Sequence, residues 1–371
     1  MIVQRSHSFR FGCNAFQFDL FSTQSLDDEY RSLFSAIFNY ATLPFYWPIY
    51  EPTPGSYPYD TRLHNMTSWL ESFNATAKGH PIIWQDPNIV PSWMASLNQT
   101  GQRQAALDRI DTVLARFPEI KTWDLVNEMT HVPNTWLGST PEATWETALA
   151  RARTDRPGNT TEFIANEYTI GDNFAPDMFY QFVSNVVADG YAPDALGFQF
   201  HTTKEWFPME QLISTFDDFG AFKIPCHVTE FIPASNGSYT GGIHPGPITE
   251  ESQATWAVDA YTMLFSLPAV QAITWWDFSS NSWPAWQVNN GGYMMAPDGR
   301  VLPVYERLFN LIHVQWNSST TTNLDANGRL QFTGFYGNYD YRIGNSGPFQ
   351  HFSIVDNRPI AGRPWRTSDV T

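Results

Sequence analysis

Lysine is the residue type that this chain most clearly lacks. Only Lys78, Lys121, Lys204 and Lys223 occur among 371 residues, and the formal net charge is −16. A strongly acidic surface repels the phosphates of nucleic acids and of anionic membranes. We therefore expect neither nucleic acid nor a membrane as a partner, and the charge suits a soluble protein that binds a neutral ligand.

Long hydrophobic runs are absent too. No stretch approaches the roughly 18–20 apolar residues needed to span a bilayer. The first ten residues, MIVQRSHSFR, lack the hydrophobic region of a signal peptide. Either the protein is not exported, or its signal peptide is absent from this chain. Because the composition is rich in tryptophan and poor in lysine, we favour export, to an extracellular or periplasmic location.

Cysteine is nearly absent. Cys13 and Cys226 are the two in the chain, and neither belongs to a Cys-x-x-Cys or Cys/His pattern of zinc ligands. We expect no metal and no cofactor. The two cysteines fall in the first and seventh of the strands predicted below, which are not neighbours in an eight-stranded barrel. We therefore expect two free thiols, since a disulfide needs Cα atoms within about 7 Å.

The chain alternates between short apolar segments and amphipathic segments, which predicts strand–helix pairs. The expected strands are 9–16, 38–46, 79–84, 121–127, 162–168, 195–200, 225–230 and 270–276. The expected helices are 26–37, 60–75, 102–116, 142–153, 176–189, 208–219, 250–266 and 301–312. Eight such pairs predict an α/β fold, a (β/α)8 TIM barrel, over residues 1–314. A doubly wound sheet would need a Gly-rich turn after the first strand, and Phe11-Gly-Cys-Asn14 is not one.

Residues 315–371 follow a different pattern. Between Gly328 and Ile343 polar and apolar residues alternate, and glycines interrupt the run, which predicts β-hairpins. No low-complexity linker precedes this segment. We therefore expect a small C-terminal β appendage packed on the barrel, in a protein that is a monomer.

Aromatic residues are abundant, with 15 Trp, 16 Tyr and 28 Phe. Barrel cores are built mainly from branched aliphatic side chains, so many of these rings should lie elsewhere. Sugar rings stack on aromatic rings through offset contacts. Core and loop packing accounts for about half of the rings, and the remainder favour a carbohydrate ligand.

Two expected strands end on a glutamate, in Thr122-Trp-Asp-Leu-Val-Asn-Glu128 and Cys226-His-Val-Thr-Glu230. Barrels place catalytic residues at the C-terminal ends of their strands. Two facing carboxyl groups about 5–5.5 Å apart are the catalytic pair of a retaining glycosidase. Glu128 would be the acid/base, with a pKa raised by apolar surroundings, and Glu230 the nucleophile, kept ionised by donors such as His201. Alone, either glutamate would more often be a solvated surface residue.

Five segments in this order resemble glycoside hydrolase family 10, the family of endo-β-1,4-xylanases. They are Glu51-Pro-Thr-Pro-Gly55, Gly79-His-Pro-Ile-Ile-Trp84 with Pro91-Ser-Trp93, Trp123-Asp-Leu-Val-Asn-Glu128, Asn166-Glu-Tyr168 and Thr229-Glu230. Trp275 and Trp283 keep the eight-residue spacing of two family tryptophans around strand eight. The resemblance spans most of residues 10–312.

The resemblance implies roles for single residues. Glu128 would be the acid/base and Glu230 the nucleophile, oriented by His201. Asn127 and His80 would bind hydroxyls of the sugar beside the scissile bond. Walls of the cleft and further substrate contacts would come from Trp84, Tyr168, Gln199, Trp275 and Trp283. Taken singly, these histidines and tryptophans would more often be core residues, and the shared register reverses that.

Three positions depart from the family pattern, and so does the strand-eight loop Trp276-Asp-Phe-Ser-Ser-Asn-Ser282. Leu43 and Tyr46 stand where strand two usually carries Asn and Lys, and Gln85 stands where a histidine usually follows the strand-three Trp. Buried polar groups that bind hydroxyls discriminate strongly between sugars. We therefore expect a retaining hydrolase of β-glycosidic bonds in a plant or algal polysaccharide or oligosaccharide, xylanase-like, with Leu43, Tyr46 and Gln85 lining an altered non-reducing-side subsite.

Two other classes fit less well. A non-catalytic glycan-binding barrel would keep the tryptophans and lose a glutamate, whereas this chain keeps Glu128 and Glu230. A metal-dependent barrel hydrolase would need clustered ligands such as His-x-His on strand one. The segment Phe11-Gly-Cys-Asn-Ala-Phe16 contains none.

Overall fold

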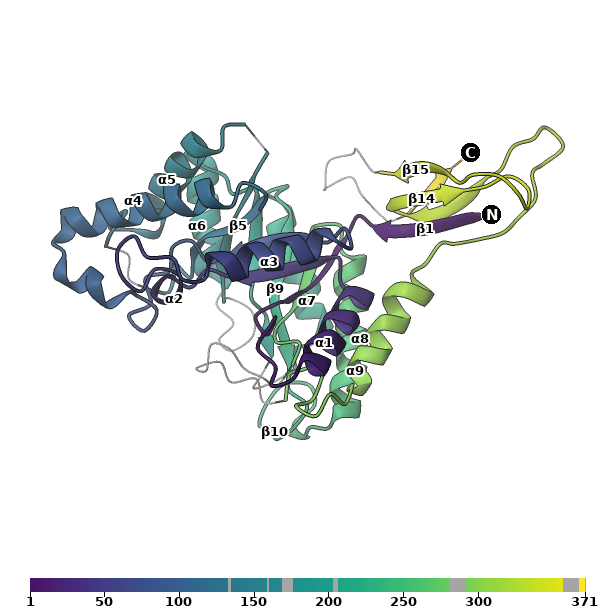
Figure 1. Cartoon of the computed structure of the whole chain (residues 1–371), viewed down its shortest axis with the longest axis horizontal. Helices are drawn as coiled ribbons and strands as arrows, with labels where there is room; N and C mark the ends of the chain where they lie inside the picture. The colour runs from purple at the N-terminus through teal and green to yellow at the C-terminus, as the bar shows by residue number, and fades with distance from the viewer. Residues whose placement is uncertain are drawn as a thin grey trace.

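Eight parallel strands form a closed barrel in the computed structural model, which describes residues 1–132, 135–158, 160–168, 176–202, 206–279, 291–355 and 367–370 (Figure 1). The order around the barrel is β2 (Arg10–Asn14), β3 (Tyr40–Pro44), β4 (Thr76–His80), β5 (Thr122–Asn127), β6 (Glu162–Glu167), β7 (Ala195–Phe198), β9 (Cys226–Pro233) and β12 (Val270–Trp275). The barrel closes because β12 pairs with both β9 and β2. The predicted (β/α)8 fold is confirmed.

Helices follow the strands as the sequence predicts. They are α1 (Gln24–Ile37), α3 (Asp60–Glu71), α4 (Gln99–Arg116), α5 (Pro141–Asp155), α6 (Pro176–Ala188), α7 (Met209–Gly220), α8 (Glu250–Ser266) and α9 (Pro303–Asn310). Side-chain caps define several starts, because Thr23, Asn98, Thr140 and Thr249 each accept a backbone N–H of the first turn. None of the helices in the described ranges is long and apolar enough to cross a membrane.

Short helices and strands lie in the loops between these pairs. They are α2 (Trp47–Tyr50), the 3₁₀ helix η1 (Ser92–Ser96), the π-helical turn η2 (Leu311–Gln315), β8 (His201–Thr202), β10 (Ser238–Tyr239) and β11 (Gly246–Pro247). The strand β8 pairs with the last residues of β9, so it extends the sheet beside Glu230.

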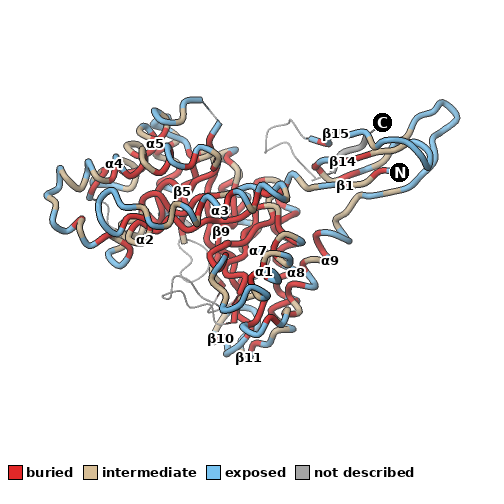
Figure 2. Tube along the Cα trace, in the orientation of Figure 1, coloured by how far each residue is buried: buried red, intermediate tan, exposed pale blue. Residues whose placement is uncertain are grey.

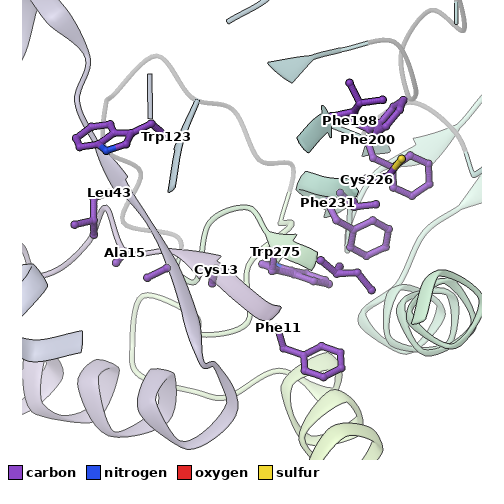
Figure 3. Close-up of a cluster of buried hydrophobic side chains, with 14 of the residues drawn as sticks. Phe11, Cys13, Ala15, Leu43, Trp123, Phe198, Phe200, Cys226, Phe231 and Trp275 are labelled. Atoms are coloured by element: carbon purple, nitrogen blue, oxygen red, sulfur yellow. The ribbon is translucent and has the colours of Figure 1, made fainter. Parts of the chain in front are cut away.

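Buried residues concentrate on the barrel strands and on the inner faces of the helices (Figure 2). Aromatic rings fill much of this core, including Phe11, Trp123, Phe198 and Phe231 (Figure 3). Gly79 shows how tightly they pack, since a Cβ atom at this position would lie 2.0 Å from the Trp123 ring. Core packing therefore accounts for a large share of the aromatic content.

Cys13 and Cys226 are both buried free thiols. They lie on β2 and β9, which β12 separates in the sheet, and Figure 3 shows them apart. The expectation of two free thiols is confirmed.

The C-terminal appendage contains β13 (Phe332–Phe335), β14 (Gly337–Tyr341), β15 (Gln350–Ile354) and β16 (Thr367–Val370). Two strands, β13 and β14, lie in the segment 328–343 as expected, but the expected hairpins are wrong, because β13 pairs with β16 and β14 pairs with β1 and β15. One strand comes from elsewhere: β1 (Ile2–His7) pairs antiparallel with β14, so the first residues join the appendage and not the barrel. The division at 314/315 stays a prediction, and β1 crosses it.

The appendage packs against one end of the barrel, from which the sheet of β1, β14 and β15 projects (Figure 1). Phe265 of α8 contacts it through Trp316 at 4.2 Å, Phe335 at 5.6 Å and His7 at 6.2 Å between ring centroids. Because β1 leads into the start of β2, this is the end where the barrel strands begin. Glu128 follows the opposite end of β5, and Glu230 lies in the second half of β9.

Candidate active site

Glu128 follows the last residue of β5 and is 9% exposed. Its backbone N–H donates to the carbonyl oxygen of Asn166 at 2.8 Å. Gln199 Nε2 donates to Glu128 Oε1 at 2.8 Å, and Trp84 Nε1 donates to Glu128 Oε2 at 3.0 Å. Burial, together with the charges of Glu230 and Glu167, raises the pKa of Glu128 to about 8. The carboxyl group is therefore protonated at neutral pH, as a general acid must be.

Glu230 lies in β9 and is 4% exposed. Asn166 Nδ2 donates to Oε1 at 3.0 Å, and His201 Nε2 lies 3.0 Å from Oε2. Burial alone would raise the pKa of Glu230, but the His201 hydrogen bond and the positive charges of His80, His201 and Lys78 outweigh it, so this pKa is lowered. Glu230 is thus ionised while Glu128 is protonated.

Asn166 connects the two glutamate strands. Its Nδ2 donates to Asn127 Oδ1 at 2.8 Å as well as to Glu230, and its Oδ1 accepts from the Thr229 hydroxyl at 2.6 Å. Gly197 of β7 makes room for it, because a Cβ atom there would lie 2.4 Å from Asn166 Oδ1. Sequence reasoning assigned no role to either residue, although Asn166 was visible in the Asn-Glu-Tyr segment.

Asn127 is 2% exposed, and its Oδ1 is occupied by Asn166. Its Nδ2 is buried and has no hydrogen-bond partner within the described residues. A buried donor without a partner is costly unless something else accepts from it. This donor belongs to the residue that directly precedes Glu128, which makes it available to a bound molecule.

His80 is the last residue of β4, and its ring contacts a buried ion pair. Its Nδ1 lies 2.7 Å from Asp124 Oδ2, and Lys78 Nζ lies 2.7 Å from the same oxygen. Burial would raise the pKa of Asp124, but the Lys78 charge and the His80 hydrogen bond outweigh it and lower this pKa. An ionised Asp124 fixes a proton on His80 Nδ1, and the orientation of the ring with it.

Other predicted residues lie around these groups. Tyr46 precedes α2 and packs edge-on to His80 at 5.6 Å between ring centroids, and its ring lies 6.2 Å from that of Trp84. Tyr168 follows β6 and is half-buried, with its ring 4.2 Å from that of His131. Trp283 lies outside the described residues.

Gln85 connects two loops. Its Nε2 donates to the Thr135 hydroxyl at 3.2 Å, and its Oε1 accepts from the Thr135 backbone N–H at 3.0 Å. These bonds join the loop after β4 to the loop after β5, so the amide of Gln85 serves the loops that frame Glu128.

Two expectations are wrong. Leu43 and Trp275 do not line the site, because both are 0% exposed in the main hydrophobic core (Figure 3). Barrel strands are covered on both faces, and successive side chains point to opposite faces. Trp276, one residue further on, lies at the site, with its ring 5.4 Å from that of His80 and 6.4 Å from that of His201.

An apolar group of side chains surrounds Tyr46. It contains Phe16, Tyr46, Ile89, Ile232 and Trp276, all buried, with Ile49 and Trp84 packed against it. The Phe16 ring meets those of Tyr46 at 5.7 Å and Trp276 at 5.2 Å, both edge-on. One member, Phe16, carried no signal in the sequence beyond its type.

The described residues contain no group of three or more His, Cys, Asp or Glu side chains that could hold a metal ion. The arrangement of the site is therefore a protonated and an ionised carboxyl group, joined through Asn166 and surrounded by aromatic rings. Such a pair can donate a proton on one side of a bond and attack from the other.

Known proteins with similar sequences and folds fit this geometry. The family model "Glycosyl hydrolase family 10" matches residues 6–310. Endo-1,4-beta-xylanase 2 of Arabidopsis thaliana is 22% identical over 92% of this chain and 30% of its own length. Anti-sigma-I factor RsgI6 of Acetivibrio thermocellus is 24% identical over 91% of this chain and 41% of its own. The chain thus spans less than half the length of these relatives.

Among solved structures, xylanase 10B of Thermotoga petrophila RKU-1, in complex with xylobiose, has a TM-score of 0.69 at 20% identity and covers 83% of this chain and 95% of its own. This likeness supports the barrel fold. Since the family match covers most of the barrel and both glutamates, the chain belongs to glycosyl hydrolase family 10.

Proposed function

We propose that this protein is a retaining glycoside hydrolase that cleaves β-1,4-linked xylan or a closely related β-glycan. The observation that carries the proposal is the opposite protonation of two glutamates in one site. Burial raises the pKa of Glu128 to about 8, whereas the His201 hydrogen bond and nearby positive charges lower that of Glu230 despite burial. The xylanases among the relatives support this substrate class.

The reaction would proceed in two steps. In the first, Glu230 attacks the anomeric carbon while Glu128 protonates the departing glycosidic oxygen, which leaves a covalent glycosyl–enzyme ester. In the second, Glu128, now ionised, takes a proton from water, and the water oxygen attacks the anomeric carbon and releases Glu230. No redox partner or Lewis acid is needed. The carboxyl separation of about 5–5.5 Å expected for this mechanism stays a prediction.

Neighbouring groups would bind the sugar. The free Nδ2 donor of Asn127 suits a hydroxyl beside the scissile bond, and the fixed ring of His80 can bind another. Trp84 is half-buried and donates to Glu128, so its ring can stack on a sugar while its N–H orients the acid. The protein would act as an exported monomer on its glycan.

The apolar group around Tyr46 would alter the non-reducing-side subsite. Rings and aliphatic side chains cannot donate the hydrogen bonds that an amide and an ammonium group would provide. We therefore propose that plain xylan is a poorer substrate than a substituted, shorter or otherwise related β-linked glycan. A product profile over a panel of such glycans would identify the substrate.

The first test compares the wild type with Glu230→Ala on an aryl β-xylobioside and follows the product by NMR. Wild-type hydrolysis with a β-anomer as first product, abolished in Glu230→Ala, supports the proposal. An α-anomer would contradict the two-step mechanism. Glycan binding with no hydrolysis by the wild type would favour the alternative of a non-catalytic glycan-binding barrel.

A further inference from the structure

The backbone of Glu128 adopts a left-handed conformation, with φ +57°, that residues other than glycine seldom adopt. The turn that follows folds back on it, because the backbone N–H groups of His131 and Val132 donate to the Glu128 carbonyl oxygen at 3.2 and 2.9 Å. Such a conformation persists only where the surroundings enforce it. The direction of the Glu128 carboxyl group therefore depends on what holds this turn.

A buried carboxylate on the neighbouring strand holds it. Glu167 is the last residue of β6 and is 0% exposed. Its Oε1 accepts from the backbone N–H of Thr130 at 2.6 Å, and its Oε2 lies 2.8 Å from Nδ1 of His131. Both oxygens of one side chain thus contact two consecutive residues of the turn.

His131 is itself fixed in place. Its ring lies 4.2 Å from that of Tyr168 at an interplanar angle of 34°, and its Nδ1 also lies 3.0 Å from the Thr130 hydroxyl. The side chain is 13% exposed. The ring is therefore held by a close, tilted contact with Tyr168 and by a hydrogen bond to a buried carboxylate.

We propose that Glu167 and His131 are a positioning pair for the acid/base: they hold the turn of residues 128–132 so that the Glu128 carboxyl group faces Gln199 and Trp84. This inference rests on the proposed function. The carboxyl group of Glu128 is bonded to Gln199 and Trp84 at 2.8 and 3.0 Å, so the pair acts on it through the backbone. In addition, the negative charge of Glu167 contributes to the raised pKa of Glu128.

The test exploits the fact that a good leaving group departs without protonation. It compares wild type and His131→Phe on phenyl and 2,4-dinitrophenyl β-xylobiosides, using kcat/KM because this ratio reports the first half-reaction. Phenylalanine keeps a ring to pack on Tyr168 but removes the donor to Glu167. We expect roughly a ten- to hundredfold loss on the phenyl substrate and a change within about twofold on the dinitrophenyl substrate.

A conservative variant and a matched control complete the experiment. His131→Asn places an amide N–H near the position of Nδ1, so we expect it to recover most of the phenyl activity. His64 of α3 provides the control, since its Nδ1 lies 3.2 Å from Glu119 Oε1 and its ring stacks at 4.4 Å on Phe117. Glu119 precedes β5, so His64→Phe removes a histidine–glutamate contact at the other end of that strand. We expect no change on either substrate.

The outcomes separate this inference from the proposed function. Equal losses of His131→Phe on both substrates, with a lowered melting temperature, would reduce the pair to a structural role and overturn the inference. Unchanged rates on both would do the same. A wild-type protein that hydrolyses neither substrate would refute the proposed function, and the positioning role with it.

Discussion

Glu128 and Glu230 have the same side chain, and their neighbours make them chemically different. Their pKa values predict the pH dependence of kcat/KM on an aryl β-xylobioside. Activity should rise as Glu230 loses its proton, at a pH below the usual 4.5, and fall as Glu128 loses its proton, with an apparent pKa of about 8. The sign follows from the roles, since only ionised Glu230 with protonated Glu128 is active. An alkaline limb centred below pH 6 would contradict the assignment, and Glu128→Gln should abolish that limb.

Tyr46 and Leu43 were expected to act together, and the structure separates them. Tyr46 packs on His80 at the site, whereas Leu43 is buried in the core. We expect Tyr46→Lys to raise the turnover of unsubstituted xylan by roughly two- to tenfold, because one hydroxyl contact contributes about 0.5–1.5 kcal/mol. Leu43→Asn should instead lower the unfolding free energy by about 1–3 kcal/mol, since it buries an amide without partners. Xylan turnover and urea denaturation measure the two effects, and a rise in xylan turnover from Leu43→Asn would contradict this placement.

Gly197 of β7 is a position where a small substitution should change the surroundings of both glutamates. An alanine there would place its Cβ 2.4 Å from Asn166 Oδ1 and so displace the side chain that bonds Asn127 and Glu230. We expect Gly197→Ala to lower kcat by about a hundredfold, as small misplacements of catalytic groups can. Gly220→Ala is the control, because its Cβ would meet its nearest neighbour, Ala269, at 3.5 Å. Similar activities of the two variants would show that Asn166 does not depend on this space.

The strands and helices of the barrel were predictable because their pattern is local. Alternation between short apolar runs and amphipathic segments is repeated eight times, and all eight pairs are found within a few residues of their expected bounds. Glu128 was predictable for the same reason, since it directly follows its strand, and Glu230 was recognised although β9 continues past it to Pro233. The face of a strand to which a given side chain points is harder to predict from the local sequence. Trp275 and Trp276 illustrate this, because a shift of one residue decides which indole ring contacts His80.

Contacts between segments that are distant in the chain could not be predicted from the sequence. The strand β1 reads as an ordinary alternating segment, and only its pairing with β14 makes it part of the appendage. The Glu167–His131 contact joins the last residue of β6 to the turn after β5. The two residue types alone do not predict it, because a histidine after a strand that ends on a glutamate is usually a solvated or core residue. Asn166 was recognisable as part of a segment, whereas its bonds to Asn127, Thr229 and Glu230 depend on three strands meeting.

Phe265 packs between the appendage and the barrel. Its truncation should therefore weaken the attachment of the appendage without unfolding the barrel. Its ring contacts Trp316 and Phe335 as well as Phe9 and Phe11. We expect Phe265→Ala to cost about 3–5 kcal/mol of unfolding free energy and to accelerate proteolytic cleavage in the exposed loop 321–329. Phe219→Ala is the matched control, because Phe219 of α7 packs against Phe198 of β7. It should lose similar stability and leave cleavage of that loop unchanged, and faster cleavage in both variants would contradict a local role.

The pairing of β1 with β14 also determines the order in which the parts of this protein can fold during synthesis. The N–H donor of Met1 and the acceptor on Arg342 are 341 positions apart. During synthesis β1 has no strand to pair with until residues 337–341 have left the exit tunnel, and at about 5–20 residues per second this takes tens of seconds. The barrel closes when β12 reaches β2, while β1, attached directly to β2, still presents unpaired backbone groups. The nascent chain must therefore carry an open strand edge beside its first barrel strand until β14 has been synthesised.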